Sequence, residues 1–269
     1  MVKTRDSRLF RIVGRELPER RLNGLWKLFE LWDERLFING RHAIESRYSF
    51  KVMFGKLQEE FSEASRAMSS YRRARDTEVK TECASKTADE IGDLVNMAGL
   101  MVPYLNEDYP CSYDDGHVPL ERMILNMRRR MPDFRRVPIT SFDSVNNYNK
   151  KQLFEIWLRE MEGIAQQQIS PHAHTLEGQK KISRVFNNNV RKAFDIIDYR
   201  NRFDDSEYKE FMNPDGPAID ALGDVVINGF IGMRELEGIT YEYFLGNMCD
   251  KLIRRDERYR QTIKRQNGK

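Results

Sequence analysis

The chain has 269 residues, of which 40% are hydrophobic and 32% charged, with only 16 glycines and 9 prolines. This composition provides enough apolar side chains for a core, excludes collagen-like and low-complexity proteins, and favours long amphipathic helices over many short strands. Charge alone identifies no partner, because 45 Lys and Arg balance 42 Asp and Glu to a net charge of +3. The length fits one large domain or two small ones.

The sequence contains no run of about 18 apolar residues, so we expect no membrane-spanning helix and no membrane partner. No apolar stretch follows the basic residues near the N-terminus, so we expect no secretory signal. Cys83, Cys111 and Cys249 are odd in number and widely spaced, which indicates reduced thiols without a disulfide framework. These features together predict a cytoplasmic protein.

The first half of the chain has apolar residues at helical spacing. One stripe is formed by Phe54, Leu57, Phe61, Ala64 and Met68, which recur at three- and four-residue steps. We expect a first helix at 22–37, ended by Asn39-Gly40, and a second at 46–71, followed by a polar loop at 72–85. A third helix should run from a cap at Ser85 or Thr87 to about Pro103, and a fourth from Pro119 to Arg130.

The second half continues the helical pattern after a break. Residues 137–149 fit no period and are predicted to be a linker. Helical spacing returns at 150–169, 179–200, 217–236 and 240–262, with a turn at 213–216. No segment shows a sustained two-residue alternation, so the chain is predicted to be all-α.

Four carboxylates occupy matching positions on two of the predicted helices. Glu60 and Glu63 are spaced i, i+3 on the helix at 46–71, and Glu90 and Asp93 repeat that spacing on the next helix. Both pairs flank an apolar stripe, so antiparallel packing would bring the four groups together at the edge of the core. Gly92, between Glu90 and Asp93, costs about 1 kcal/mol relative to alanine, which indicates close approach of another helix or a ligand.

Carboxylates gathered in this way repel one another unless cations neutralise them. Mg²⁺ is the first candidate, because it prefers oxygen ligands and commonly joins carboxylates to substrate phosphates; Mn²⁺ is the alternative. Two charged, solvated helix faces without any ligand are the simpler explanation, although two such pairs on consecutive helices are more specific than one.

The order of these motifs resembles a known superfamily. Glu59-Glu60-Phe61-Ser62-Glu63 followed by Glu90-Ile91-Gly92-Asp93 resembles the all-α nucleoside triphosphate pyrophosphohydrolases, which include the MazG-type enzymes, the dCTP pyrophosphatases and the dimeric dUTPases. Downstream, Arg128-Arg129-Arg130-Met131-Pro132 looks like the basic segment of the dCTP pyrophosphatase branch, with Met131 where that branch has an aromatic residue. The resemblance covers roughly residues 46–136.

This resemblance implies a function and a set of site residues. Glu60, Glu63, Glu90 and Asp93 would hold Mg²⁺, and a (d)NTP, dCTP-like, dUTP-like or non-standard, would be cleaved between its α and β phosphorus atoms to a monophosphate and pyrophosphate. The metal would stabilise the developing charge and lower the pKa of a water, and Glu60 or Glu63 would accept the proton of that water.

The basic segment would supply the groups that bind phosphate. Arg128, Arg129 and Arg130 would hold the phosphates through forked donors, and Arg122 is a further candidate on the same predicted helix. An ordinary solvated helix end, stabilised by the helix dipole, is the alternative for these arginines.

The C-terminal half looks like a second, degenerate copy. Residues 223–226 (Gly-Asp-Val-Val) resemble 92–95 (Gly-Asp-Leu-Val), and 157–165 can be laid on 56–64. The ending at 252–259 also looks like the Arg-x-Asp-x-x-Tyr ending of dimeric dUTPases.

This register leaves the second copy with few ligands. Three of the four carboxylates are replaced, by Met161, Ile164 and Ala221, and Asp224 alone remains. The second copy therefore cannot hold Mg²⁺ in the same way. Asp220 and Asp224 could form a different, weak site with Glu160 or Glu162.

We therefore expect tandem MazG-like helical bundles, with a catalytic domain at 1–138 and a degenerate repeat at 139–269 that completes the bundle. The enzymes that this sequence resembles work as dimers or larger assemblies. The second copy would supply such a partner within the chain, and a homo-oligomer is the other possibility. The expected partner is a nucleoside triphosphate in nucleotide-pool control.

The alternative is a helical nucleic-acid-binding or nucleotide-sensing regulatory protein without catalysis. It would use the basic segments 121–136 and 251–269. Nucleic acid is the less favoured partner, because the acidic quartet would repel a phosphate backbone in the absence of metal.

Overall fold

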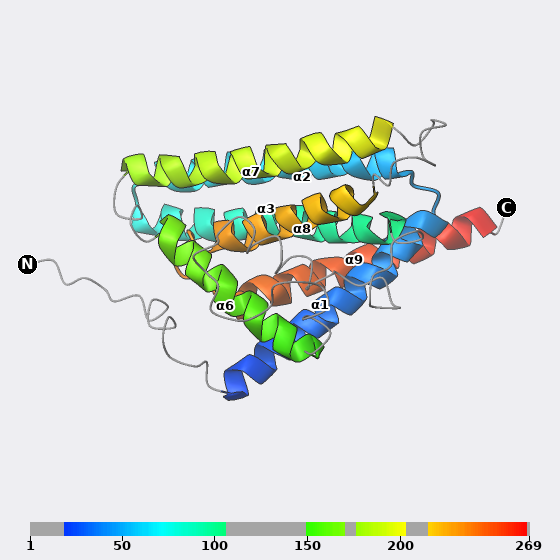
Figure 1. Cartoon of the computed structure of the whole chain (residues 1–269), viewed down its shortest axis with the longest axis horizontal. Helices are drawn as coiled ribbons and strands as arrows, with labels where there is room; N and C mark the ends of the chain where they lie inside the picture. Colours follow the sequence, from blue (N-terminus) through cyan, green and yellow to red (C-terminus); the bar gives the residue numbers. More distant parts are fainter. Residues whose placement is uncertain (1–18, 106–148, 170–175, 203–214, 268–269) are drawn as a thin grey trace, which may run out of the picture.

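A computed structural model describes residues 19–105, 149–169, 176–202 and 215–267. Within these ranges the protein is all-α, as the sequence predicts, with no strand (Figure 1). The α-helices are α1 (Glu19–Glu45), α2 (Phe50–Arg73), α3 (Thr77–Met101), α6 (Lys150–Ile169), α7 (Leu176–Arg202), α8 (Asp215–Met233) and α9 (Tyr241–Asn267). A short 3₁₀ helix, η2 (Val102–Leu105), follows α3. The helix expected at 119–130 lies outside the described residues, as does the linker apart from Asn149.

Helix α1 runs past the predicted stop at Asn39-Gly40, so that prediction is wrong. The Asn39 side chain donates to the carbonyl of Arg35, at 2.9 Å, and stays within the helix. Gly40 is buried, and a Cβ there would lie 2.7 Å from Cγ of Pro103. The glycine therefore permits close packing against η2 instead of ending the helix.

Helix α3 begins about two turns before the predicted cap, so the loop expected at 72–85 is wrong. Asp76 caps the helix by accepting hydrogen bonds from the backbone N–H groups of Glu78 and Val79, at 2.9 and 3.1 Å. Thr87 lies within the helix, where its hydroxyl donates to the carbonyl of Cys83 at 2.6 Å. The early start gives α3 the length to lie along all of α2.

The helices are arranged as two long pairs on one side and a group of three on the other (Figure 1). Helix α2 packs along α3, and α7 packs along α8. Helices α3 and α8 touch in the centre, while α2 and α7 touch on the outer side. Helices α1, α6 and α9 cover the opposite side of the α3–α8 layer.

Both halves of the chain contribute to one continuous core. Phe29 of α1 meets Phe154 and Trp157 of α6, and the rings of Trp32 and Trp157 lie 6.0 and 4.9 Å from that of Phe230 on α8. All five aromatic side chains are buried. Because the rings come from elements far apart in sequence, the first and last thirds of the described chain are held together by this core.

In the alignment of the second copy with the first, residues 157–165 of α6 are matched with residues 56–64 of α2. In the structure the helix that runs along α8, as α2 runs along α3, is α7. None of the described helices has the length and apolar character needed to cross a membrane.

Candidate metal centre

Three of the four predicted carboxylates converge where α2 and α3 run side by side. Oxygen atoms of Glu60, Glu90 and Asp93 all lie within 4.8 Å of one another, and all three residues are partly buried. Glu60 comes from α2 and the other two from α3, where one turn separates them. Among the residues that the structure describes, this is the one group of three or more potential metal ligands with such spacing.

Glu63, the fourth predicted ligand, lies just outside this group. Its side chain is 42% exposed, and one of its oxygens is 3.8 Å from a guanidinium nitrogen of Arg66. Glu63 and Glu90 line the same pocket, so Glu63 stays next to the cluster without joining its closest set of oxygens.

Two of the three carboxyl groups have a raised pKa. Burial raises the pKa of Glu60 to about 7, with a further increase from the charge of Asp93, while Arg255 acts in the opposite direction. Burial also raises the pKa of Glu90, helped by the charges of Glu63 and Asp93. A cation placed between these oxygens would relieve both effects.

Two basic side chains of α9 reach the cluster from the far end of the sequence. The Lys251 ammonium lies 2.5 Å from Oδ2 of Asp93 and donates to the carbonyl of Asp89 at 2.8 Å. A guanidinium nitrogen of Arg255 lies 3.9 Å from Oε1 of Glu60. Positive groups therefore border the carboxylates on the side that faces α9.

Lys251 and Arg255 are not among the site residues that the sequence predicts. Both belong to the basic segment 251–269, and Arg255 lies inside the ending at 252–259 that looks like the dUTPase ending. These two features of the sequence point to the segment. No local spacing, however, indicates which residues of a basic helix face a carboxylate 158 positions earlier.

Close packing of α9 on α3 explains how these side chains reach the cluster. A Cβ at Gly92 would lie 3.2 Å from Cγ of Met248, so the glycine allows α9 to approach at the level of the carboxylates. Asn247 also donates a side-chain hydrogen bond to the carboxylate of Asp89. The close approach predicted at Gly92 is therefore that of a helix.

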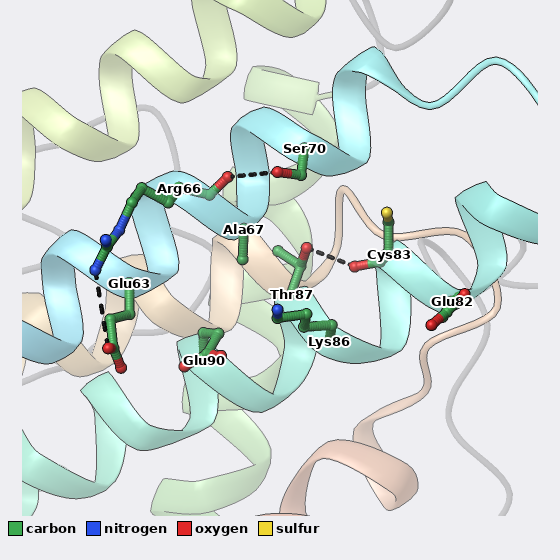
Figure 2. Close-up of a pocket in the computed structure, with 9 residues that line it drawn as sticks. All are labelled: Glu63, Arg66, Ala67, Ser70, Glu82, Cys83, Lys86, Thr87 and Glu90. Carbon is green, nitrogen blue, oxygen red and sulfur yellow. Dashed lines mark hydrogen bonds and ion pairs between the residues drawn. The ribbon is translucent and has the colours of Figure 1, made fainter.

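A pocket of about 520 Å³ opens beside the cluster, between α2 and α3 (Figure 2). Figure 2 shows the side chains of the two helices facing each other across it. The lining residues are Glu63, Arg66, Ala67 and Ser70 of α2 and Glu82, Cys83, Lys86, Thr87 and Glu90 of α3. A volume of this size is typical of small-molecule sites.

The predicted phosphate-binding arginines lie outside the described residues: Arg122, Arg128, Arg129 and Arg130. The acids of the second half do not form a comparable group in the described part of the chain. Glu160, Glu162 and Asp224 are buried, and Glu162 pairs with Arg234 at 2.8 Å.

The donor set at the cluster fits a hard divalent cation. Glu60, Glu90 and Asp93 offer carboxylate oxygens alone, which suit Mg²⁺ or Mn²⁺ better than the softer metals that prefer nitrogen or sulfur. Partial exposure leaves room for water and phosphate oxygens to complete the coordination.

Comparisons with known proteins add no relative: no family model, no curated protein sequence and no solved structure matches this chain.

Proposed function

We propose that this protein is a Mg²⁺-dependent nucleoside triphosphate pyrophosphohydrolase. The observation that carries the proposal is the convergence of Glu60, Glu90 and Asp93 within 4.8 Å, beside a pocket of about 520 Å³. The motif resemblance to the all-α pyrophosphohydrolases, which includes these same three residues, supports the same reaction class. The substrate class is a (d)NTP, dCTP-like, dUTP-like or non-standard, and the role is nucleotide-pool control in the cytoplasm.

In the proposed reaction, water adds across the α–β phosphoanhydride to give a nucleoside monophosphate and pyrophosphate. Glu60, Glu90 and Asp93 hold Mg²⁺, with Mn²⁺ as the alternative. When bound, the metal supplies charge stabilisation for the phosphates and makes water more acidic. Glu63 lies just outside the closest group of oxygens, 3.8 Å from a guanidinium nitrogen of Arg66, and would take up the proton that water releases.

The chain's own cations bind the phosphates in this scheme. Lys251 and Arg255 already face the cluster and would turn from the carboxylates to phosphate oxygens once a metal takes over their neutralising role. Arg122, Arg128, Arg129 and Arg130 remain candidates for the same task.

We further propose that the C-terminal half is a degenerate repeat that completes the site of the first half, at 1–138, from within the same chain. Support comes from α9, which carries Lys251 and Arg255 to the cluster formed by α2 and α3. A homo-oligomer would add a second copy of this arrangement.

The direct test is to measure pyrophosphate and monophosphate release by the purified full chain. The substrates are a panel of dNTPs and NTPs, each with Mg²⁺, with Mn²⁺ and with a chelator. We expect metal-dependent release from at least one nucleotide. Glu60→Gln should lose it, whereas Glu59→Gln, at an exposed neighbouring position on α2, should retain it. No release from any nucleotide by the wild type would refute the proposal.

One contact favours a second candidate, a nucleotide-sensing protein without catalysis. The 2.5 Å ion pair between Lys251 and Asp93 neutralises that carboxylate without metal. Saturable nucleotide binding, measured by calorimetry, with no product formed would favour this candidate over the enzyme.

A further inference from the structure

The pocket and the carboxylate cluster follow one another along the groove between α2 and α3. At one end, Ser70 of α2 and Glu82 of α3 line the pocket; towards the cluster, Glu63 and Glu90 line it. Glu60 and Asp93 come next, one turn further along each helix. Because α2 and α3 run antiparallel, these residues form a continuous path.

The far side of the cluster has a different character. Arg255 lies near Glu60, and the same guanidinium group reaches the sulfur of Met97, one turn beyond Asp93, at 3.5 Å. Lys251 lies on Asp93 itself. The groove is therefore asymmetric, with an open pocket on one side of the carboxylates and two cations at and beyond them on the other.

The chemistry of the pocket suits an uncharged ring system better than a polyphosphate. Its buried wall consists of Ala67 and Thr87, and the Thr87 hydroxyl donates to the carbonyl of Cys83 at 2.6 Å, so neither side chain brings an unused hydrogen-bond donor to the pocket. Lys86 and Arg66 are offset by the acids Glu63, Glu82 and Glu90 in the same lining. Three acids against two bases give no net attraction for phosphate.

The end of the pocket away from the cluster is firmly held. Arg72, two residues after Ser70, forms a two-pronged ion pair with Glu235, with N–O distances of 2.8 and 2.9 Å. The two side chains are 9% and 4% exposed. The adjacent Tyr71 hydroxyl accepts from the backbone N–H of Glu237 at 3.1 Å. The pocket is thus bounded by anchored backbone, which favours a preformed shape.

We propose that this pocket holds the nucleoside of the substrate and that the β and γ phosphates point the other way, towards Lys251 and Arg255. The inference rests on the proposed function and adds to it the orientation of the bound nucleotide. The bond to be cleaved then lies over the carboxylates, with the monophosphate leaving from the pocket side and pyrophosphate from the α9 side. Cys83 contacts the nucleoside.

Alkylation of Cys83 tests this direction without any mutation. Wild-type full chain with Mg²⁺ is treated with iodoacetamide, and each cysteine peptide is followed by mass spectrometry. The probes are the α,β-methylene analogues of dCTP, dUTP and ATP, the corresponding monophosphates, and inorganic pyrophosphate. Cys249, which is 3% exposed, is the internal reference for unfolding.

We expect at least one nucleotide analogue and its monophosphate to slow the labelling of Cys83 roughly fivefold or more, because a bound nucleoside removes the thiol from solvent. Saturating pyrophosphate should leave the rate unchanged. Equal protection by pyrophosphate, or no protection by an analogue that calorimetry shows to be bound, would overturn the inference. Neither result would affect pyrophosphate release, which tests the proposed function separately.

A pair of variants on α2 gives a second test. Ala67→Leu adds bulk to the pocket wall and should raise the KM for nucleotide roughly tenfold, with Mn²⁺ affinity unchanged. Ser62→Leu makes a similar addition at an exposed position of α2 outside the pocket and should leave both constants unchanged. An unchanged KM in a folded Ala67→Leu protein would contradict the inference.

Discussion

The two long helix pairs of this protein have the same arrangement but opposite interiors. Between α2 and α3, the groove is partly open and carries Glu60, Glu90 and Asp93. Between α7 and α8, the side chain of Asn189 donates to that of the buried Asn228 at 3.0 Å. Neutral amides joined by a hydrogen bond can be buried at small cost, whereas several like-charged carboxylates must stay near water or cations.

The difference indicates a division of labour between the pairs. The α7–α8 pair contributes packing, because its central polar groups bond to one another and to backbone, as when Asn228 donates to the carbonyl of Asp224 at 2.7 Å. The α2–α3 pair carries a cluster of carboxylates that basic residues of these two helices do not fully neutralise. Part of the missing charge is supplied by Lys251 of α9.

The largest effect should come from neutralising matched aspartates in the two pairs. Asp93→Asn removes a proposed ligand and should reduce pyrophosphate release by on the order of 100-fold or more. Asp224→Asn keeps the size of a buried side chain away from the cluster and should leave the rate within about threefold once the folded fraction is considered. Equal losses in the two variants would mean that the pairs do not differ in function.

A second effect concerns how closely the central helices approach. A Cβ at Gly229 of α8 would lie 2.2 Å from Cγ2 of Val95 on α3, and a buried β-branched side chain has little freedom to move. Gly229→Ala should therefore lower the free energy of unfolding by about 1–3 kcal/mol, as measured by urea denaturation.

Two other glycines calibrate that measurement. Gly92→Ala meets the flexible Met248 side chain at 3.2 Å, so a loss well below that of Gly229→Ala is expected. Gly55→Ala, at an exposed position of α2 with nothing within 4 Å, should stabilise the protein by about 0.5–1 kcal/mol. A Gly229→Ala protein as stable as the wild type would show that α3 and α8 are not closely packed.

How much of this could be predicted from the sequence depends on the range of the interactions. The i, i+3 spacing of the acids is local, and it correctly places Glu90 beside Asp93 on one helix. The convergence with Glu60 needs only an antiparallel pair, which a short connection makes natural. The position of Glu63 outside the closest set of oxygens depends on the rotation of α2 against α3, which the local spacing does not determine.

The structure departs from the predictions where a local sequence signal competes with tertiary packing or with a stronger local signal. Asn39-Gly40 is a common turn sequence, but contact with Pro103, more than sixty residues later, keeps it helical. Asp76 is a stronger cap than the predicted Ser85 or Thr87 because it accepts two backbone N–H groups. Lys251 and Arg255 act through tertiary packing alone, which no single-sequence spacing reveals.

A third, smaller effect concerns the positive charge that Lys251 of α9 places beside the proposed metal site. In Lys251→Met, Asp93 loses the ammonium 2.5 Å away, so the cluster becomes more negative. Mn²⁺ should bind several-fold more tightly to the nucleotide-free protein, while the KM for nucleotide should rise roughly tenfold because a phosphate partner is lost. Arg254→Met, at an exposed position of the same helix, is the control. Changes of both constants in the same direction would exclude the dual role of Lys251.

The smallest predicted effect is the pH dependence that Glu60 gives to the metal-free protein. Burial and the Asp93 charge raise the pKa of Glu60 from its usual 4.5 to about 7 in the folded state. Below pH 4.5 the group is protonated in both the folded and unfolded states. Between pH 4.5 and 7 the unfolded chain releases a proton that the folded protein retains, so folding becomes less favourable as the pH rises.

Glu60→Gln removes this titration, which makes the difference between wild type and variant the quantity to measure. In a chelator, the unfolding free energy of the wild type relative to Glu60→Gln should decline from pH 4.5 to about 7 and then level off. Mg²⁺ should reverse the decline in the wild type, since ionised Glu60 then gains a cation, and should do less in the variant. The α7–α8 pair is unchanged in both proteins, so its contribution cancels. Parallel stability curves, with and without Mg²⁺, would show that the α2–α3 carboxylates are as well compensated as the buried groups of the other pair, and that the contrast between the two pairs has no electrostatic basis.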